Sequence, residues 1–469
     1  NPMGRTAMNS ILYRLITVAG LLALAQPGSA QEDLMNVYQR ALQNDPLIRE
    51  AEAIYLASLE ARPQARSNLL PQFSFNVSAT TSDSEDPTPT TNFQTGRPDP
   101  LSIGSQTERD STTLSLNLNQ TIFDKGQFVT LRQADKRVLR AETDYQLAKQ
   151  DLIIRVAEAY FEVLAAEDTL SAEQAARDAI GRQLEQAQRR FEVGLIAITD
   201  VQESQSGYDL SIATEISAQR ILATAREFLR EIVNAYITEL AGPAEQIPLL
   251  SPQPDDVDAW VRVSMDQNLA LNSSRIAADI ASDDIDIQRG SRLPTLRLSG
   301  SYSETDSDTI RTILRTGSAI PTPSTSAPEG YSLSLNFVVP LYTGGFNSSR
   351  IQQAVYQHRA TLETLERIAR QTERLTRDAY LGVISEISRV RALRQAVQSS
   401  EIALQATEAG FQVGTRTTVD VLISQNTLAR ARTNFARSRY DYILNVLGLQ
   451  QAAGSLSVDD LDQINGWLE

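Results

Sequence analysis

The sequence predicts an α+β membrane protein built from one structural unit that occurs twice. Three observations lead to this prediction. The same motifs return about 220 residues apart, segments of alternating polar and apolar residues occur in pairs, and a long proline-free stretch follows each pair. Alternation with period two indicates strands with one apolar and one polar face, whereas apolar residues spaced three and four apart indicate helices.

Residues 1–30 are expected to be a secretory signal peptide. Arg5 and Arg14 precede or open the apolar run LITVAGLLALA, and Gly28 and Ala30 supply the small residues of a cleavage site after Ala30. The apolar run is too short for a helix that crosses a bilayer. The chain is therefore expected to be exported.

The composition argues against several classes of function. The 469 residues include no cysteine and a single histidine, His358, which aligns with Val138 in a helical seam and is interpreted as a packing residue. No Ser/His/Asp, Cys/His or metal-ligand spacing occurs, so we predict no enzyme, catalytic residue, metal or cofactor. The formal charge of −15 argues against nucleic acid, because binding phosphate requires an excess of Lys and Arg.

The internal repeat is the strongest pattern in the chain. FEVGLIAITDV (191–201) aligns with FQVGTRTTVDV (411–421), and SLNLNQTIFDKG (115–126) aligns with SLNFVVPLYTGG (334–345). Offsets this constant indicate a duplicated unit. The predicted organisation is a first repeat at 31–240, a linker with four prolines at 241–256, a second repeat at 257–448 and a C-terminal segment at 449–469.

Each repeat begins with helices (33–66; 255–290) and continues into a β-hairpin, at about 71–123 in the first and about 294–342 in the second. In the first hairpin Phe73, Phe75 and Val77 alternate with polar residues. This period-two pattern predicts strands with one apolar face. The polar, proline-rich stretches 81–110 and 303–329 are expected to be long loops, which gives four strands.

A long helical hairpin follows each β-hairpin, over 124–240 and 346–448. No proline occurs between Asp124 and Phe191 or between Phe346 and Phe411. A helix of that length extends roughly 100 Å at a rise of about 1.5 Å per residue. Gly194 and Gly414 are expected to end the long helices as left-handed caps. Asp200 and Asp420 then lie at the start of the returning helices, where a carboxylate is favoured by the helix dipole.

Physical constraints connect these elements. Four amphipathic strands cannot close into a membrane barrel, which needs at least about eight. If the strands cross a membrane, the chain must therefore oligomerise. Acidic helical rods with Ala-rich seams would then line a conduit that continues from the barrel.

The tip motifs FEVGLIAITDV and FQVGTRTTVDV, with TIFDKG and VPLYTGG after the hairpins, resemble the outer membrane channel-tunnels of the TolC type. The resemblance covers nearly all of the mature chain. It implies a homotrimer with a twelve-stranded transmembrane β-barrel, four strands per chain, continued by a long α-helical barrel in the periplasm of a Gram-negative bacterium. The implied function is an outer membrane exit duct for tripartite efflux pumps, type I secretion or both. The implied partners are outer membrane lipid, a periplasmic adaptor and an inner-membrane RND, ABC or MFS transporter.

The resemblance also implies a gate at the periplasmic tips, formed by Thr199, Asp200, Phe411 and Arg416. A contact from Arg416 to Asp200 or Thr199 would be charge-assisted, hence strong yet breakable. Phe411 departs from the tyrosine of the best-studied members, so a hydroxyl link is lost and the closed state is expected to be held less tightly.

Two further sets of residues follow from the resemblance. Asp420 matches an acidic ring in the lumen, where three carboxylates would select cations and raise one another's pKa. Ile423 stands where a second acidic ring would lie, so cation block is expected to be weaker. The adaptor is expected to dock on the two tips, at Val193, Gly194, Leu195, Val413, Gly414 and Thr415.

Two other classes of protein compete with this interpretation. A periplasmic coiled-coil adaptor or scaffold would also be exported and helical, but it predicts a single hairpin flanked by compact β domains. An exported acidic enzyme of helical fold would need a catalytic constellation that the sequence lacks. The transported substrates, the choice between drug efflux and protein secretion, and the identity of the pump stay open at this level.

Overall fold

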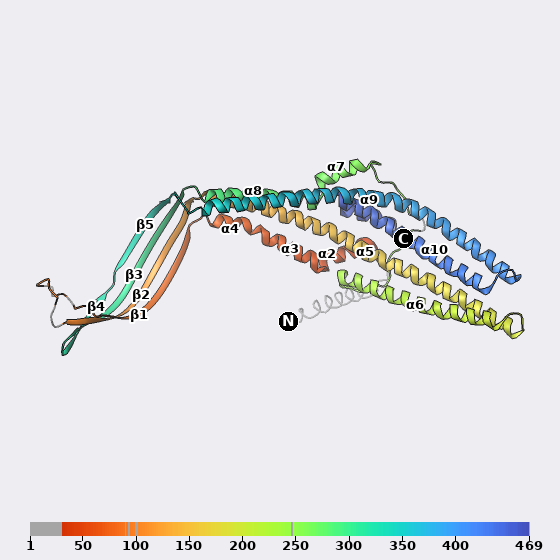
Figure 1. Ribbon diagram of the computed structural model, residues 1–469, viewed down its shortest axis with the longest axis horizontal. Helices are drawn as coiled ribbons and strands as arrows, with labels where there is room; N and C mark the ends of the chain where they lie inside the picture. Colours follow the sequence, from red (N-terminus) through yellow and green to blue (C-terminus); the bar gives the residue numbers. More distant parts are fainter. Residues whose placement is uncertain (1–30, 90, 92–93, 99–101, 245–246, 469) are drawn as a thin grey trace, which may run out of the picture. The chain divides into compact units, whose positions relative to one another are not determined.

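The computed structural model describes residues 31–89, 91, 94–98, 102–244 and 247–468, so the predicted signal peptide lies outside the described residues. The chain divides into two compact units (Figure 1). The helical unit consists of the described residues within Asn1–Glu52, Asp144–Asn272 and Ile368–Glu469. The sheet unit consists of those within Ala53–Thr143 and Ser273–Arg367.

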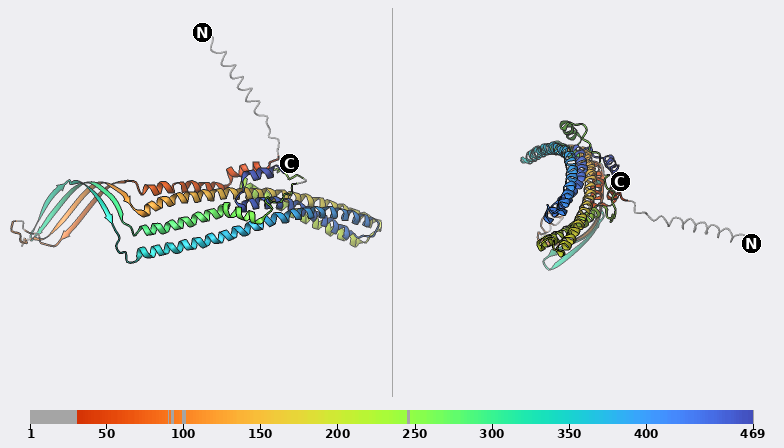
Figure 2. Two further views of the ribbon diagram at one scale, coloured as in Figure 1. Left: turned by 90° about the horizontal axis from the view of Figure 1, so that it is seen from above. Right: turned by 90° about the vertical axis from the view of Figure 1, so that its right-hand side faces the viewer.

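The sheet unit contains one antiparallel sheet, whose strands lie side by side in Figure 2. Strand β2 pairs with β1 on one side and with β3 on the other, so the centre of the sheet joins segments that are about 200 residues apart in the chain. Strands β4 and β5 pair with successive parts of β3. The strands are β1 (Gln72–Asp86), β2 (Ser102–Phe123), β3 (Thr295–Arg315), β4 (Ser318–Ser326) and β5 (Glu329–Val338).

The prediction of long loops is wrong over most of 303–329 and at both ends of 81–110, where the chain forms strands. Strand β1 continues to Asp86, and β3 continues to Arg315 before a tight turn at Gly317 leads into β4. The sheet therefore has five strand segments instead of four. Pro321 and Pro323 are tolerated in β4 because, among the described strands, β4 pairs only with β3 and an edge strand can leave one row of backbone positions without donors.

The two faces of the sheet differ in chemistry. Phe73, Phe75 and Val77 on β1 are exposed, as are Leu333, Leu335 and Phe337 on β5. The alternate residues are small and polar, and cross-strand serine pairs bond on that side: Ser299 to Ser334 (2.8 Å) and Ser301 to Ser332 (2.9 Å). The period-two prediction is thus confirmed, and the described chain leaves the apolar face of the sheet uncovered.

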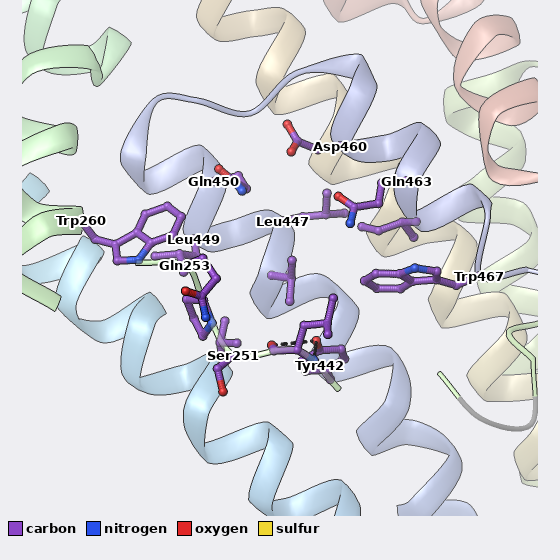
Figure 3. Close-up of a pocket in the computed structure, with 15 residues that line it drawn as sticks. Ser251, Gln253, Trp260, Tyr442, Leu447, Leu449, Gln450, Asp460, Gln463 and Trp467 are labelled. Carbon is purple, nitrogen blue, oxygen red and sulfur yellow. Dashed lines mark hydrogen bonds between the residues drawn. The ribbon is translucent and has the colours of Figure 1, made fainter. Parts of the chain in front are cut away.

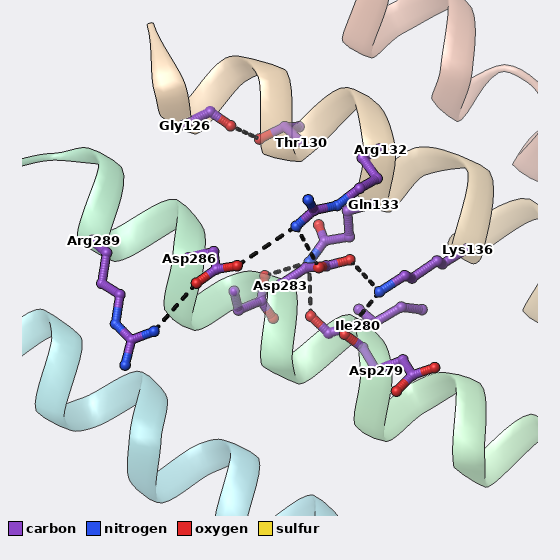
Figure 4. A network of polar contacts seen from close by, with 11 residues as sticks. Gly126, Thr130, Arg132, Gln133, Lys136, Asp279, Ile280, Asp283, Asp286 and Arg289 are labelled. Atoms are coloured by element: carbon purple, nitrogen blue, oxygen red, sulfur yellow. Dashed lines mark hydrogen bonds and ion pairs between the residues drawn. The ribbon is translucent and has the colours of Figure 1, made fainter. Parts of the chain in front are cut away.

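Beside the sheet, the same unit contains α4 (Ala61–Ser67), most of α8 (Leu269–Gly290) and the first part of α5 (Lys125–Glu192). A polar network joins α5 to α8 (Figure 4). The buried carboxylate of Asp283 accepts ion pairs from Arg132 (2.9 Å) and Lys136 (2.7 Å). Gln133 of α5 is fully buried, and its side-chain amide donates to the carbonyl of Ile280 (2.9 Å). These contacts fix the two helices against each other.

In the helical unit, α5 turns back into α6 and α9 turns back into α10, and the two hairpins lie next to each other (Figures 1 and 2). The proline-free stretches are helical, as predicted. Helix α3 (Pro46–Leu59) begins in this unit. The other helices are α2 (Leu34–Asn44), α6 (Ile198–Val233), α7 (Val257–Gln267), α9 (Phe346–Gln412, later part), α10 (Thr418–Ala453) and α11 (Val458–Asn465). None of the described helices combines the length and the apolar character needed to cross a bilayer.

The core of the helical unit is centred on two buried tyrosines. Tyr160 on α5 donates its hydroxyl hydrogen to the carbonyl of Ala241 (2.6 Å). Tyr442 on α10 accepts a hydrogen bond from the backbone of Leu250 (2.9 Å). Both partners belong to the proline-rich linker, so the linker is anchored to the two hairpins by one tyrosine each.

A cavity of about 200 Å³ lies beside this linker (Figure 3). Trp260, Trp467 and Tyr442 line it together with several leucines. The indole of Trp260 donates to the carbonyl of Pro254 (2.9 Å), and its side chain is otherwise buried. Trp260 therefore packs in the core.

Candidate functional site: the paired helical tips

The first tip is a helix end closed by backbone hydrogen bonds. Helix α5 ends at Glu192, and Gly194 follows with φ 76°. The amide of Gly194 donates to the carbonyl of Phe191 (2.9 Å), and that of Leu195 donates to the carbonyl of Arg190 (2.9 Å). This pair of bonds is the Schellman motif, which needs a residue that tolerates a left-handed conformation. Gly194 is thus a left-handed cap, as predicted.

The second tip repeats this arrangement with one change. Gly414 has φ 80°, and the amide of Thr415 donates to the carbonyl of Gly410 (2.9 Å), the residue that corresponds to Arg190. A Cβ added at Gly410 would lie 2.8 Å from Cγ of Arg416. The aliphatic part of Arg416 therefore occupies the space that a side chain at position 410 would need.

The returning helices are capped by the two predicted aspartates. Asp200 accepts a hydrogen bond from the backbone of Ala197 (3.3 Å), which has no side-chain oxygen to return one. Asp420 accepts from both the backbone (2.9 Å) and the hydroxyl (3.0 Å) of Thr417. The amide of Asp420 in turn donates to the Thr417 hydroxyl oxygen (3.2 Å). The second tip therefore has a complete capping box and the first has half of one.

The electrostatics of Asp420 follow from this cap. Hydrogen bonds from the backbone and hydroxyl of Thr417 stabilise the charged carboxylate and lower the pKa of Asp420, with a smaller contribution from nearby Arg416. The predicted mutual raising of the pKa belongs to a ring of three chains and stays a prediction. Ile423, one turn later, is exposed.

The predicted gate residues lie at the two tips, Thr199 and Asp200 on one and Phe411 and Arg416 on the other. Thr199 and Arg416 are exposed and Asp200 is half-buried. Among the described residues of this single chain, no hydrogen bond or ion pair joins Arg416 to Thr199 or Asp200. That link stays a prediction, and it would have to form between chains or after movement of a tip.

The predicted docking residues form exposed ends. Leu195 and Val413 are 73% and 76% exposed, and Val193 is also exposed. A Cβ added at Gly194 or Gly414 would meet nothing within 4 Å. Exposed apolar side chains next to open glycines leave room for a partner helix, although docking itself stays a prediction.

The sequence did not indicate a contact that joins the two hairpins. The guanidinium of Arg190 lies over the ring of Phe411, with Cζ 4.6 Å from the ring centroid. The repeat gives no signal for this contact, because Arg190 aligns with Gly410 and Phe411 aligns with Phe191. In the described part of the chain no three His, Asp or Glu side chains gather in a way that could hold a metal ion. His358 is half-buried on α9.

Comparison with known proteins gives consistent results. The sequence pattern of the family described as outer membrane efflux protein matches residues 37–235 and 260–455. The outer membrane protein TolC of Vibrio cholerae is 36% identical over 93% of this chain and 94% of its own length. The alkaline protease secretion protein AprF of Pseudomonas aeruginosa is 27% identical over 97% of this chain and 91% of its own. The crystal structure of the outer membrane protein VceC of Vibrio cholerae has a TM-score of 0.70 at 19% identity, covering 90% of this chain and 96% of VceC, which shows a shared fold.

Proposed function

Because this chain belongs to the outer membrane efflux protein family, we propose that it serves as an outer membrane exit duct for efflux pumps and for type I secretion. The observation that carries the proposal is the amphipathic sheet. Its exposed apolar face has Phe73, Phe75 and Val77 on one strand, and its other face is polar. A sheet of this kind suits a barrel with lipid outside and water inside.

The edges of the sheet support assembly from several chains. Among the described strands β1 pairs only with β2, while β4 and β5 pair only with β3. Open edges are unfavourable in a membrane because unpaired backbone groups have no water to bond. The sheet has four strand positions, since β4 and β5 share one. Three copies would then form a twelve-stranded barrel, with the helical hairpins forming a periplasmic duct.

The tips are the proposed gate and docking surface. Thr199, Asp200, Phe411 and Arg416 would hold the duct closed, and Asp420 would form a cation-selective ring. A periplasmic adaptor would dock on the exposed ends at Val193–Leu195 and Val413–Thr415, and an RND, ABC or MFS transporter would drive opening. An adaptor function for this chain itself is not favoured, because the chain has two helical hairpins and an uncovered amphipathic sheet.

The first experiment is planar-bilayer conductance of the purified protein, together with its mass in detergent. We expect a trimer with small, cation-selective conductance. Arg416→Ser removes a charge-assisted link, so the ratio of open to closed channels should rise roughly 10- to 100-fold. Asp420→Ala should reduce cation preference. A protein that forms no pores as a trimer would refute the proposal.

A second variant tests the position of the Arg416 side chain. In Gly410→Ala the new Cβ would lie 2.8 Å from Cγ of Arg416 and 3.1 Å from the hydroxyl of Thr415. The arginine must move, and the conductance should rise as it does in Arg416→Ser. Gly448→Ala is the matched control, since a Cβ there meets nothing within 4 Å. Equal conductance of the two alanine variants would exclude a role for this placement of Arg416.

A further inference from the structure

Two of the contacts between the helical hairpins near their tips differ in kind. Arg190, at the end of α5, covers the ring of Phe411, at the end of α9. Farther along the returning helices, Gly207 of α6 faces Leu422 of α10, and a Cβ at position 207 would lie 3.1 Å from Leu422 Cδ1. The first contact involves a charge and a ring, whereas the second depends on close approach.

Arg190 is held in position by the turn that follows it. Its carbonyl accepts the hydrogen bond from Leu195 that closes the first tip. This bond fixes the backbone of Arg190, and with it the direction in which the side chain leaves the helix. The guanidinium therefore reaches Phe411 from a fixed base.

Burial shows what the arginine does to the ring. Phe411 is 7% exposed, although its neighbours Gln412 and Val413 are exposed. Its counterpart in the first tip, Phe191, is 42% exposed. Phe411 is less exposed than Phe191, as expected if the guanidinium of Arg190 covers the ring of Phe411. A phenylalanine offers no hydrogen-bonding group, so the face of its ring is the only part that can attract a cation.

Behind this contact the surface between the hairpins is polar. A cavity of about 220 Å³ is lined by Arg182, Gln183, Gln186 and Ala179 of α5, by Glu408 and Gln412 beside Phe411 on α9, and by Gln425 of α10. Nε2 of Gln183 and Oε1 of Gln425 are buried and have no hydrogen-bond partner among the described residues. A cavity of this size and polarity has room for water. Separating such surfaces exposes little apolar area, so the polar seam itself resists opening weakly.

We propose that Arg190 is a further gate residue, whose cation–π contact with Phe411 latches the first hairpin to the second within each chain. The inference rests on the proposed function and deepens it. Arg190 holds one hairpin to the other inside a chain. Its partner Phe411 has no side-chain group that could form a hydrogen bond across the hairpins instead. Opening the duct at this point requires the guanidinium to leave the ring.

The strength of the latch sets the expected effect. A cation over an aromatic ring contributes enough to change an equilibrium roughly 2- to 30-fold, more when the pair is shielded from water. Arg190→Gln should therefore raise the ratio of open to closed channels within that range. Arg190→Lys keeps the cation and should stay close to the wild type. Arg189→Gln is the matched control, because Arg189 forms an ion pair within its own helix, with Glu185.

A double-mutant cycle in planar bilayers tests the contact. Phe411→Leu removes the ring, and Arg190→Gln removes the cation. Each variant breaks the contact from a different hairpin, so one of them can still test it if the other fails to assemble. We expect Arg190→Gln, Phe411→Leu and the double variant to open to the same extent, since each removes the same interaction. Opening by the lysine variant as large as by the glutamine variant, or additive effects in the double variant, would overturn the latch.

The outcomes also separate the latch from the proposed function. If the wild type forms cation-selective pores and Arg416→Ser opens them while Arg190→Gln behaves as the Arg189→Gln control does, the duct stands and the latch is wrong. If the wild type forms no pores as a trimer, the proposed function itself fails, and the latch fails with it.

Discussion

Removing the two cations that neutralise Asp283 should loosen the packing of α8 on α5. The perturbation is the double variant Arg132→Met and Lys136→Met, which keeps two long side chains and removes both positive charges. The Asp283 side chain is only 6% exposed, and its carboxylate lies 2.9 Å from Arg132 and 2.7 Å from Lys136. The variant leaves a buried carboxylate without a compensating charge.

The structure gives the size of this effect. Breaking a buried pair by removing one side typically costs about 3–5 kcal/mol, because the remaining charge stays desolvated. Asp283→Asn should cost less, since the Arg132 side chain, 54% exposed, still pairs with Asp286 (3.6 Å) and can reach water. Replacing all three residues by apolar ones should restore much of the loss, because no buried charge remains.

Hydrogen exchange of the α8 amides is the assay. For amides that exchange when α8 separates from α5, about 3–5 kcal/mol corresponds to a roughly 150- to 5,000-fold faster exchange. Arg62→Gln is the matched control. Arg62 of α4 pairs with Asp135 of α5, and their side chains are 67% and 55% exposed. Such exposed pairs contribute about 1 kcal/mol or less. Exchange in the double variant no faster than in this control would refute the reasoning.

Two further predictions concern the tips and their approach. Gly207→Val should destabilise the protein by about 1–3 kcal/mol through overpacking, because even a Cβ at this position lies 3.1 Å from Leu422. Gly448→Ala, by contrast, should stabilise α10 by up to about 1 kcal/mol. Equal thermal unfolding temperatures of the two variants would contradict this prediction. Hydrogen bonds from Thr417 lower the pKa of Asp420 below its ordinary value of 3.8. The carboxylate of Asp420 therefore stays charged at pH 3.8 and above, and it is protonated only when the pH falls through the lowered pKa of the folded protein. Thr417→Val should therefore lose cation selectivity at a higher pH than the wild type when permeability ratios are followed from about pH 5 down to about pH 3, and identical profiles would show that Thr417 does not set this pKa.

Local patterns in the sequence were reliable where the structure depends on neighbours in the chain. The long helices could be predicted because a proline-free stretch with apolar residues three and four apart has one compatible backbone. The caps at Gly194 and Gly414 could be predicted because a left-handed residue at a helix end favours glycine. In both cases the hydrogen bonds join residues only a few positions apart.

Partners distant in the chain were not predictable in the same way. The sequence predicts a loop at 303–329 because its polar residues and prolines carry no burial signal, yet most of this stretch pairs with neighbouring strands. The contact of Arg190 with Phe411 joins residues 221 positions apart by number, and neither residue marks the other in the sequence.

The amphipathic strands, the long helices and their glycine tips can be predicted from the amino-acid sequence, because they follow from side-chain periodicity and backbone sterics within one segment. The order of the strands, the length of β3 and the contacts between tip residues became known from the folded chain alone. Those features depend on the alignment of segments about 200 residues apart, where a shift of one residue in register would change every contact. The guanidinium of Arg190 contacts the ring of Phe411 because the two hairpins, each folded by its own local sequence, pack side by side.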